Sequence, residues 1–438
     1  MKLVIIGGAG FRVPQVVEAV ARSGPVDEVV LVDTDPGRLR TMLAVVDGLA
    51  LSGGVRVAAG TDLSAALVGA DFVFCAIRVG GAAGRVADER VALDLGVLGQ
   101  ETTGPGGLAY ALRTIPVMQA VARTVRAVAP GAWFVNFTNP AGIITEALRP
   151  ILGDRVVGIC DTPIGLMRRA ATAVGADGGA VTYDYVGLNH LGWLRTLEVD
   201  GVDRLPGLLA SPELDEIEEA RLVGLDWVRQ LGALPNEYLF YYYCNREAVA
   251  RILSAPGTRG EFLAEQQERF YVEAAAAPER ASELWRRTRQ QREQTYMAEA
   301  RAETEERHAD DGEGGYQAVA LALMGALSGG EPTAAIVNVV NEGTVPGLPE
   351  NAVVEVPCDV DADGVHPRRV SPLTGHMLGL VQSVKAVEQL TIRAATEHSA
   401  NLAWEAFATH PLVDSVDVGR RLLEGYRSRI PEVAAALA

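Results

Sequence analysis

The chain has 438 residues, more than one ordinary hydrophobic core can serve, so two domains are expected. Hydrophobic residues make up 48% of the chain and charged residues 22%, values typical of a globular protein. The formal net charge of -17 argues against nucleic acid and anionic membranes as partners, because both carry the same sign of charge.

Six short apolar runs alternate with helix-like segments over the first part of the chain. They cover Leu3–Ile6, Glu28–Val32, Val55–Ala58, Phe72–Ile77, Trp133–Phe137 and Val156–Cys160. Continuous apolar runs separated by amphipathic segments are typical of parallel strands that helices cover on both faces. The sequence therefore predicts an α/β fold whose first domain, residues 1–163, is a Rossmann-type parallel sheet that binds a dinucleotide.

A glycine-rich stretch follows the first predicted strand and opens a helix. Gly8 and Gly10 are expected to bring backbone N–H groups and the helix N-terminus onto a pyrophosphate. The third glycine of the usual pattern is absent, since Val13 and Pro14 stand in its place. Asp33, at the end of the second predicted strand, would accept hydrogen bonds from both ribose hydroxyls, which favours NAD. A purely structural glycine turn is the alternative.

Longer helical patterns follow Cys160, and residues 164–438 are expected to form a mixed α+β domain for substrate binding and oligomerisation. The predicted elements are helices at Phe262–Ala275 and Arg280–Arg307, a β-rich piece at Ala334–Cys358, and helices at His376–Ala408 and Val416–Tyr426. The dense mixed charge of Arg280–Arg307 is typical of a helix that faces solvent or a partner. Because no low-complexity linker separates the halves, we expect them to pack closely.

Cys160 and His190 each stand at or near the end of a strand-like apolar run. Alone, each would be interpreted as a buried structural residue. Their joint position favours a metal site, because side chains at the carboxyl ends of a parallel sheet face the ligand crevice. Two protein ligands are too few for a closed zinc site, so positions remain for substrate oxygens and water. The other histidines lack such a context and are interpreted as structural: His308, His366, His376, His398 and His410.

Several blocks with a specific pattern extend over the whole chain. They are Arg78-Val79-Gly80-Gly81, Gly99-Gln100-Glu101-Thr102-Thr103-Gly104-Pro105-Gly106-Gly107, Asn136-Phe137-Thr138-Asn139-Pro140, Cys160-Asp161, Gly187-Leu188-Asn189-His190, Pro235-Asn236-Glu237-Tyr238 and His410-Pro411-Leu412. Together they resemble glycoside hydrolase family 4, the NAD- and divalent-metal-dependent 6-phosphoglycosidases, and especially its 6-phospho-β-glucosidases. The Gly-Gln-Glu-Thr-Thr-Gly and Gly-Leu-Asn-His blocks are far more specific than a dinucleotide-binding motif alone.

The resemblance implies hydrolysis of 6-phosphoglycosides by a redox route. Hydride leaves sugar C3 for NAD, the C2 proton becomes acidic, the aglycone is eliminated, water adds and NADH returns the hydride. In this scheme Cys160 and His190 hold a divalent metal, manganese by family resemblance, which acts as a Lewis acid. Tyr238 takes the C2 proton, and Asp161 acts as general acid for the aglycone. Packing within a tyrosine cluster is the alternative role for Tyr238.

The resemblance also implies polar contacts to the ligands. Asn136 is expected at the cofactor, and Asn139 and Asn189 at substrate hydroxyls, although an asparagine before Pro140 would also cap a turn. Arg85 and Arg259 are the candidates for the 6-phosphate, because a guanidinium group matches a phosphate dianion. An ordinary surface position is the alternative for both arginines.

Two parts of the sequence depart from the family pattern, the cofactor loop and the residue after Cys160. The cofactor loop has Phe11 and Arg12 where the family commonly has other residues, and both are expected to contact the cofactor, with Arg12 adding a phosphate contact or tuning the loop. Asp161 follows the cysteine as in 6-phospho-α-glucosidases, whereas the β-specific relatives often have Asn. A 6-phospho-α-glucosidase is therefore the alternative within the family.

Two other classes of protein stay open. An NAD-dependent hydroxy-acid dehydrogenase would share the first domain and need no metal. A nucleotide-sensing regulatory protein without activity is the other, and the intact Cys160, His190 and Tyr238 argue against it.

The cellular setting is predicted from what the sequence lacks. The first residues enter a strand without the pattern of a secretory signal, and no apolar run has the length of a membrane span. The four cysteines do not resemble a disulfide framework. We expect a cytoplasmic protein with a small phosphorylated sugar as its substrate, and the resemblance suggests a homodimer or homotetramer.

Overall fold

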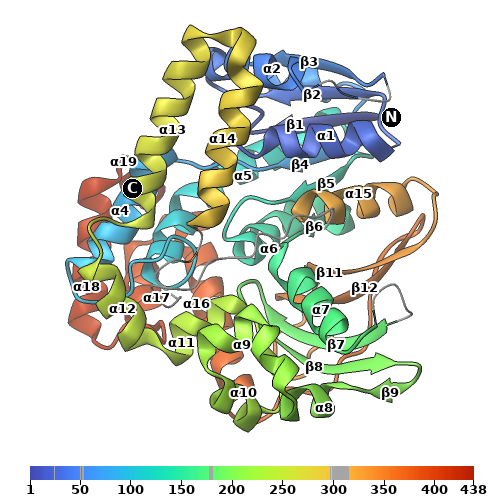
Figure 1. Cartoon of the computed structure of the whole chain (residues 1–438). Helices are drawn as coiled ribbons and strands as arrows, with labels where there is room; N and C mark the ends of the chain where they lie inside the picture. Colours follow the sequence, from blue (N-terminus) through green and yellow to red (C-terminus); the bar gives the residue numbers. More distant parts are fainter. Residues whose placement is uncertain (24, 50, 52–53, 177–180, 296, 298–314) are drawn as a thin grey trace.

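The structure is a computed structural model, and it describes residues 1–23, 25–49, 51, 54–176, 181–295, 297 and 315–438. One mixed sheet runs through this part of the chain in the strand order β10-β8-β7-β12-β11-β6-β5-β4-β1-β2-β3, with β13 beside β12 and β9 beside β8. Figure 1 shows this sheet passing from the N-terminal strands to the C-terminal ones, with helices around it. The fold is α/β in its first half and α+β in its second, as the sequence predicts.

The N-terminal half of the sheet is parallel. Its strands are β1 (Lys2–Ile6), β2 (Glu28–Val32), β3 (Arg56–Gly60), β4 (Phe72–Cys75), β5 (Trp133–Asn136) and β6 (Val156–Gly158). They stand in the order 6-5-4-1-2-3 of a Rossmann-type sheet. Each predicted strand is confirmed to within two residues at either end. The strands could be predicted because alternate residues of β1 enter different hydrophobic clusters on its two faces, which requires a continuous apolar run.

Six helices connect the parallel strands. They are α1 (Val13–Ser23), α2 (Pro36–Asp47), α3 (Leu63–Leu67), α4 (Gly81–Leu93), α5 (Pro105–Val128) and α6 (Ala141–Leu152), with the short 3-10 helix η1 (Gly153–Arg155) after α6. Asp35 caps α2, because its side chain accepts hydrogen bonds from the N–H groups of Gly37 and Arg38. These crossovers bring the carboxyl ends of all six strands to one edge of the sheet.

The C-terminal half of the sheet is antiparallel. Its strands are β7 (Val181–Leu188), β8 (Leu191–Val199), β9 (Val202–Asp203), β10 (Leu234–Pro235), β11 (Thr333–Val340), β12 (Val353–Asp361) and β13 (Gly364–Pro367). β7 and β8 form a hairpin whose turn is Asn189-His190. β11 joins the parallel half through the pairing of Asn338 with Gly158 of β6. The predicted β-rich piece is confirmed as two paired strands, and both halves of the chain share one sheet.

Helices surround the antiparallel half and return to the N-terminal half. They are α7 (Thr162–Ala173), α8 (Leu205–Ala210), α9 (Glu218–Val223), α10 (Leu225–Leu231), α11 (Phe240–Tyr243), α12 (Asn245–Ser254), α13 (Arg259–Ala276), α14 (Ala281–Gln294), α15 (Tyr316–Leu327), α16 (Gly375–Thr396), α17 (Ala400–Thr409), α18 (Val416–Arg429) and α19 (Pro431–Ala436). The 3-10 helices are η2 (Pro212–Glu216), η3 (Glu237–Leu239) and η4 (Pro278–Arg280). No described helix is both long and apolar enough to cross a bilayer.

Two helix predictions are wrong in part. The predicted helix His376–Ala408 is broken at His398, whose φ of 54° lies in the left-handed region, and Ser399 then caps α17. The predicted charged helix Arg280–Arg307 is helical over α14 and stops at Gln294, before a turn at Thr295. Residues 298–307 of this prediction lie outside the described residues. Its charged composition hides a buried face, because Trp285 is only 1% exposed.

Candidate active site

A cleft of about 2280 Å³ lies at the carboxyl ends of the parallel strands. Its wall contains the loops that follow β1, β2, β4, β5 and β6, and its far side contains residues of the C-terminal half such as His190, Tyr238 and Arg259. A pocket for one small ligand usually measures about 300–1,000 Å³. The cleft therefore has room for a dinucleotide and a second ligand.

The glycine-rich turn after β1 forms one end of this cleft. The N–H groups of Gly7 and Gly8 both donate to the carbonyl of Val32, at 2.9 and 2.8 Å. A Cβ atom on Gly8 would lie 2.6 Å from the nitrogen of Val32, and one on Gly10 would lie 2.9 Å from the carbonyl oxygen of Gly7. Both predicted glycines are thus required by the close approach of the turn to β2 and to itself.

Asp33 and Arg12 flank the turn. Asp33 follows β2, and its carboxylate accepts hydrogen bonds from the N–H groups of Ala9 at 3.1 Å and Asp35 at 3.2 Å. The guanidinium group of Arg12 lies over the rings of Phe137 and Tyr316, 5.5 and 5.3 Å from their centroids. Both predicted residues line the cleft.

Phe11 has its side chain in the core. Its ring contacts Phe270 edge-on at 5.3 Å between centroids, and the guanidinium group of Arg292 covers it at 3.8 Å. Because the ring is occupied in the core, only the main chain of Phe11 could make the predicted contact with a cofactor.

Asn136 does not line the cleft, although the sequence predicts it as a cofactor contact. Its side chain is fully buried, and its Nδ2 donates to the carbonyl of Thr138 and to Oγ1 of Thr145, both at 3.2 Å. Its Oδ1 accepts from the N–H of Thr138 at 3.0 Å. This amide holds the loop after β5, and that loop places Asn139 in the wall of the cleft.

The two predicted metal ligands line the same cleft. Cys160 follows β6, and His190 stands in the β7–β8 turn with a φ of 63°. Burial lowers the pKa of His190 to about 3, so its imidazole stays neutral with a lone pair for a metal. Burial and the nearby Glu355 and Asp161 carboxyl groups raise the pKa of Cys160, so its thiolate requires a bound cation.

This donor set fits a divalent metal ion bound by few protein ligands. A neutral imidazole and a buried sulfur are both metal ligands, and sulfur is a softer donor than manganese usually takes. Among the described residues, no group of three or more His, Cys, Asp or Glu side chains is placed to hold a metal. Cys160 and His190 would therefore leave coordination positions to a substrate.

Tyr238 lies directly against His190. Its ring stacks on His190 with 3.7 Å between centroids and 7° between planes. Its N–H donates to Oδ1 of the buried Asn236 at 3.1 Å, and Nδ2 of Asn236 donates to Oγ1 of Thr162 at 2.8 Å. That hydroxyl lies 3.4 Å from Sγ of Cys160. Asn236 thus links the segment of the predicted base to that of the predicted metal cysteine. Asp161, which follows Cys160, also lines the cleft.

A buried carboxyl group supports the turn that carries His190. Glu355 of β12 accepts hydrogen bonds from Asn189 at 3.2 Å, Asn338 at 3.0 Å and Tyr185 at 3.2 Å. Burial raises its pKa to about 7 against the opposing effect of these hydrogen bonds. Asn189 also accepts from the N–H of Ala141 at 3.1 Å and lines a small cavity of about 30 Å³, not the main cleft. Its contact with a substrate stays a prediction.

Glu355 could not be singled out from the sequence. Its only signal is an acidic residue within the apolar first part of β12. Its partners become visible only when β7, β11 and β12 pair in the sheet.

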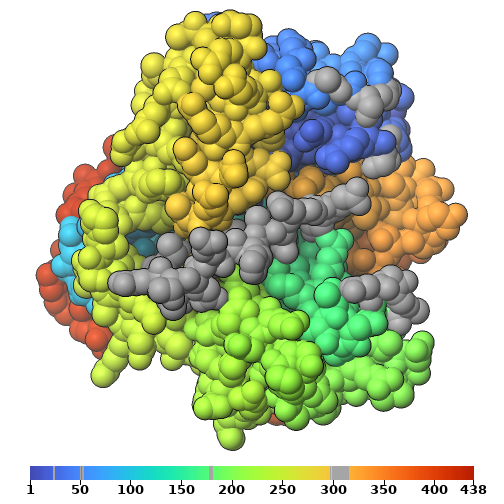
Figure 2. Space-filling view, viewed as in Figure 1, coloured from blue at the N-terminus to red at the C-terminus, as the bar shows by residue number. Residues whose placement is uncertain are grey.

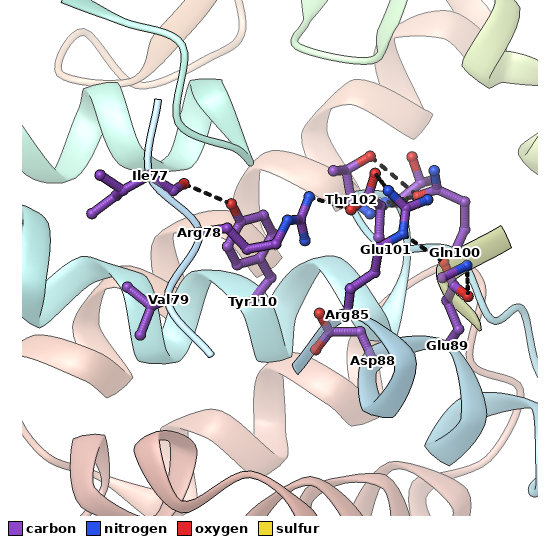
Figure 3. A network of polar contacts seen from close by, with 12 residues as sticks. Ile77, Arg78, Val79, Arg85, Asp88, Glu89, Gln100, Glu101, Thr102 and Tyr110 are labelled. Carbon is purple, nitrogen blue, oxygen red and sulfur yellow. Dashed lines mark hydrogen bonds and ion pairs between the residues drawn. The ribbon is translucent and has the colours of Figure 1, made fainter. Parts of the chain in front are cut away.

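Arg85 is already paired with carboxylates (Figure 3). Its guanidinium group lies 2.7 Å from Glu101 and 3.1 Å from Glu89, and Arg78 forms an ion pair with the same Glu101. Burial would raise the pKa of Glu101, but the charges of Arg78, Arg85 and Arg12 outweigh it and hold the pKa below the usual value. Two carboxylates thus balance Arg85, which makes it a poorer phosphate ligand than the sequence predicts.

Arg259 and a second arginine, Arg292, line the cleft together. Arg259, the first residue of α13, donates to Oγ1 of Thr295 and, at 3.0 Å, to the carbonyl of Arg292. Arg292 donates through Nε to Gln266 at 2.9 Å, and its buried Nη2 has no hydrogen-bond partner among the described residues. Burial, together with Arg12 and Arg259, lowers the pKa of Arg292 to about 9. Sequence reasoning missed Arg292 because it is one of many arginines in a charged run.

The histidines interpreted as structural lie outside the main cleft where they are described. His366 contacts Asp361, His376 contacts Tyr243, His398 contacts the carbonyl of Ala436, and His410 accepts from the N–H of Leu412. His308 lies outside the described residues.

The Rossmann-type sheet, its glycine-rich turn and the cleft lined by Cys160 and His190 are typical of an enzyme that uses a dinucleotide cofactor. A family model described as "Family 4 glycosyl hydrolase" matches residues 2–176, and one described as "Family 4 glycosyl hydrolase C-terminal domain" matches residues 185–413. The chain belongs to glycosyl hydrolase family 4.

Relatives and solved structures of this family match the chain over nearly its full length. A "Probable 6-phospho-beta-glucosidase" of Bacillus subtilis is 31% identical, with 99% of this chain and 98% of the relative covered. The 6-phospho-beta glucosidase of Thermotoga maritima, with manganese, NAD+ and glucose-6-phosphate, superposes with a TM-score of 0.82 at 28% identity and 98% coverage of both chains. A 6-phospho-alpha-glucosidase from gut microorganisms, with NAD and Mn2+, gives 0.80 at 25% identity, covering 98% of this chain and 97% of that one.

Proposed function

We propose that this protein hydrolyses 6-phosphoglycosides with NAD and a divalent metal ion, and that 6-phospho-β-glucosides are its substrates. The observation that carries the proposal is the meeting of Cys160, His190 and Tyr238 in the cleft that begins at the glycine turn. The relatives support it, since their structures hold NAD, manganese and glucose-6-phosphate. A hydroxy-acid dehydrogenase is disfavoured by membership of the glycosidase family.

The proposed roles follow from where the residues lie. When bound, NAD supplies a hydride acceptor for sugar C3, and a divalent metal, manganese in the relatives, polarises the sugar oxygens. Cys160 and His190 hold the metal, and Tyr238, stacked on His190, takes the proton from C2. Asp161 donates a proton to the departing aglycone oxygen.

The remaining contacts bind the cofactor and the sugar. Gly8 and Gly10 shape the turn, because their N–H groups donate to Val32 and Gly7, and this turn and Arg12 bind the cofactor phosphates. Asp33 binds the ribose hydroxyls. Asn139 and Asn189 contact sugar hydroxyls.

The second candidate is hydrolysis of 6-phospho-α-glucosides. It is favoured by Asp161 next to the metal cysteine and by the similarity to the 6-phospho-alpha-glucosidase structure. Initial rates on the nitrophenyl 6-phospho-α- and 6-phospho-β-glucosides decide between them, since one anomer should be cleaved at least roughly tenfold faster, a difference of about 1.4 kcal/mol in activation free energy.

The decisive experiment is cleavage of a chromogenic 6-phosphoglucoside, with NAD and manganese omitted in turn. The proposal requires both, with NAD acting catalytically and no NADH accumulating. Stoichiometric NADH without cleavage would identify a dehydrogenase, and binding of NAD without turnover of any substrate would identify a regulatory protein.

We infer a cytoplasmic homodimer or homotetramer, and all four cysteines are free thiols, as a reducing compartment would leave them. Light scattering after size exclusion gives the mass of the assembly, and a mass near 46.4 kDa would mean a monomer.

A further inference from the structure

Three aromatic side chains of the C-terminal half donate hydrogen bonds to main-chain carbonyls of the glycine-rich turn. The pairs are Tyr271 to Ala9, Trp285 to Phe11 at 2.8 Å and Tyr316 to Arg12 at 2.8 Å. We call these three residues, from α13, α14 and α15, the aromatic clamp. All three are buried. The turn that precedes α1 is therefore held by residues more than 250 positions further along the chain.

The clamp belongs to helices that pack closely on the N-terminal half. α13 and α14 contact α2, and α15 contacts α1. Figure 2 shows the surface of the α13–α14 pair meeting that of the N-terminal residues. Burial raises the pKa of Tyr271 to about 12 and raises that of Tyr316 further, so both hydroxyls stay protonated and act as donors.

Holding the carbonyls also orients the N–H groups. In a trans peptide the N–H points away from the C=O, so fixing the carbonyl of Phe11 fixes the direction of the Arg12 N–H. Fixing the carbonyl of Ala9 likewise fixes the N–H of Gly10. That N–H closes the turn, because it donates to the carbonyl of Gly7 at 2.8 Å. A turn of this kind binds a pyrophosphate through its N–H groups, so affinity depends on how well they are oriented before the ligand arrives.

Two clamp residues cannot touch a ligand directly. Tyr271 and Trp285 do not line the cleft, whereas the turn that they hold does. They act on the cleft through the main chain of the turn, and their rings also support Arg38 and Arg289, which line the cleft. If these side chains served only to pack the two halves together, their hydrogen bonds would not all need to reach carbonyl groups of the turn.

We propose that the aromatic clamp preorganises the glycine turn, so that α13, α14 and α15 form a functional part of the NAD site. The proposal rests on the use of NAD in the proposed function. Tyr271, Trp285 and Tyr316 are positioning residues that set the affinity for NAD. α13 and α14 also carry Arg259 and Arg292, which line the cleft, so these two helices both hold the cofactor turn and face the second ligand.

The test compares Tyr271→Phe with Tyr426→Phe. The first variant removes one hydroxyl and keeps the ring beneath the guanidinium of Arg38. Tyr426 is a matched control, because its buried hydroxyl also donates to a main-chain carbonyl, that of Asp88 at 2.9 Å, away from the cleft. Calorimetric titration of the full-length protein with NAD gives Kd, and thermal unfolding gives stability.

Tyr271→Phe should raise the Kd for NAD roughly three- to tenfold, as expected for one lost hydrogen bond, and kcat at saturating NAD should stay near that of the unmodified protein. Tyr426→Phe should lower the unfolding temperature and leave the Kd unchanged. An unchanged Kd in Tyr271→Phe, with a loss of stability like that of the control, would overturn the clamp. Trp285→Phe provides a second decision by the same criterion if Tyr271→Phe does not fold. Failure of the unmodified protein to bind NAD would instead refute the proposed function itself.

Discussion

Arg292 keeps a guanidinium group in a buried position beside Arg12 and Arg259. Buried like charges cost free energy unless an anion compensates them, and the lowered pKa of Arg292 reflects that cost. The structure therefore shifts the predicted phosphate site from Arg85, which two carboxylates balance, toward Arg259 and Arg292. A net acidic protein can bind an anionic sugar only through such a local group of arginines.

We predict that Arg259→Ala lowers kcat/KM on a 6-phosphoglucoside by about tenfold to a hundredfold, because a charge-assisted hydrogen bond contributes roughly 1.5–3 kcal/mol. Arg280→Ala is the control, since Arg280 is an exposed residue that pairs with Glu283 at 3.0 Å. Steady-state kinetics on phosphorylated and unphosphorylated glucosides give the answer. Equal rates on the two substrates by the unmodified enzyme would contradict the phosphate specificity altogether.

Cys160 and His190 are separate from the cofactor turn, so their loss should separate catalysis from NAD binding. Cys160→Ser and His190→Ala should each abolish turnover while the Kd for NAD stays within about threefold, less than one hydrogen bond's worth. Cys75→Ser is the matched control, because Cys75 is another buried thiol and ends the parallel strand β4 without lining the cleft. Activity near normal in Cys160→Ser with manganese present would show that the metal assignment is wrong.

Tyr238 offers a test of the chemical route. If it removes the C2 proton, reaction in heavy water should give a 6-phosphosugar with deuterium at C2, because the proton on the base exchanges before it returns. Tyr238→Phe should slow both this exchange and turnover. Product without deuterium at C2, and rates insensitive to deuterium at C2 or C3 of the substrate, would leave the redox route without support.

At the scale of elements, the N-terminal cap of α13 stands next to a residue proposed to bind the phosphate. Thr258 and Glu261 form a capping box at its N-terminus, and Arg259 is its first residue. Thr258→Ala should cost about 1 kcal/mol of stability and also raise KM for the phosphorylated substrate, because Arg259 loses its fixed position. Ser399→Ala removes the corresponding cap of α17, far along the chain, and should affect stability alone. Equal KM values in both variants would argue against a role for the cap.

The elements that could be predicted are those whose pattern is local. The parallel strands, the glycine turn and the acid after β2 follow one another within short stretches of sequence, and the structure confirms them as elements. The break at His398 could not be predicted, because apolar periodicity continues across it and only a Ser cap marks it. The burial of Trp285 could not be predicted for another reason: it depends on contact with Phe11, which lies 274 positions earlier in the chain.

The candidate site divides in the same way. Cys160, His190 and Tyr238 could be predicted from family blocks, and Arg259 from the match of a guanidinium group to a phosphate. All four line one cleft. Asn136 shows the limit of such transfer: it belongs to a family block, yet its side chain is buried behind the wall of the cleft. Glu355 and Arg292 belong to the site only through tertiary contacts, which no motif carries.

At the scale of the whole molecule, the predicted division at residue 163 does not interrupt the sheet. β6 and β11 pair across it, and helices of the last third return to the first: α16 contacts α5 and α6, and α18 contacts α4. Figure 1 shows these C-terminal helices beside α4 and α5. The two domains stay a prediction, and the halves are joined by more than a single connecting segment.

This shared sheet bears on the timing of the proposed reaction. An enzyme whose cofactor and catalytic domains swing apart on a hinge can change their separation between steps. Here a hinge motion at residue 163 would have to break the pairing of β6 with β11 and separate α16 from α5. In the proposed reaction, the glycine turn and the segment with His190 would therefore keep their separation between loss and return of the hydride. Entry and exit of a sugar would then need only movements of side chains and loops that line the cleft, without separation of the two halves.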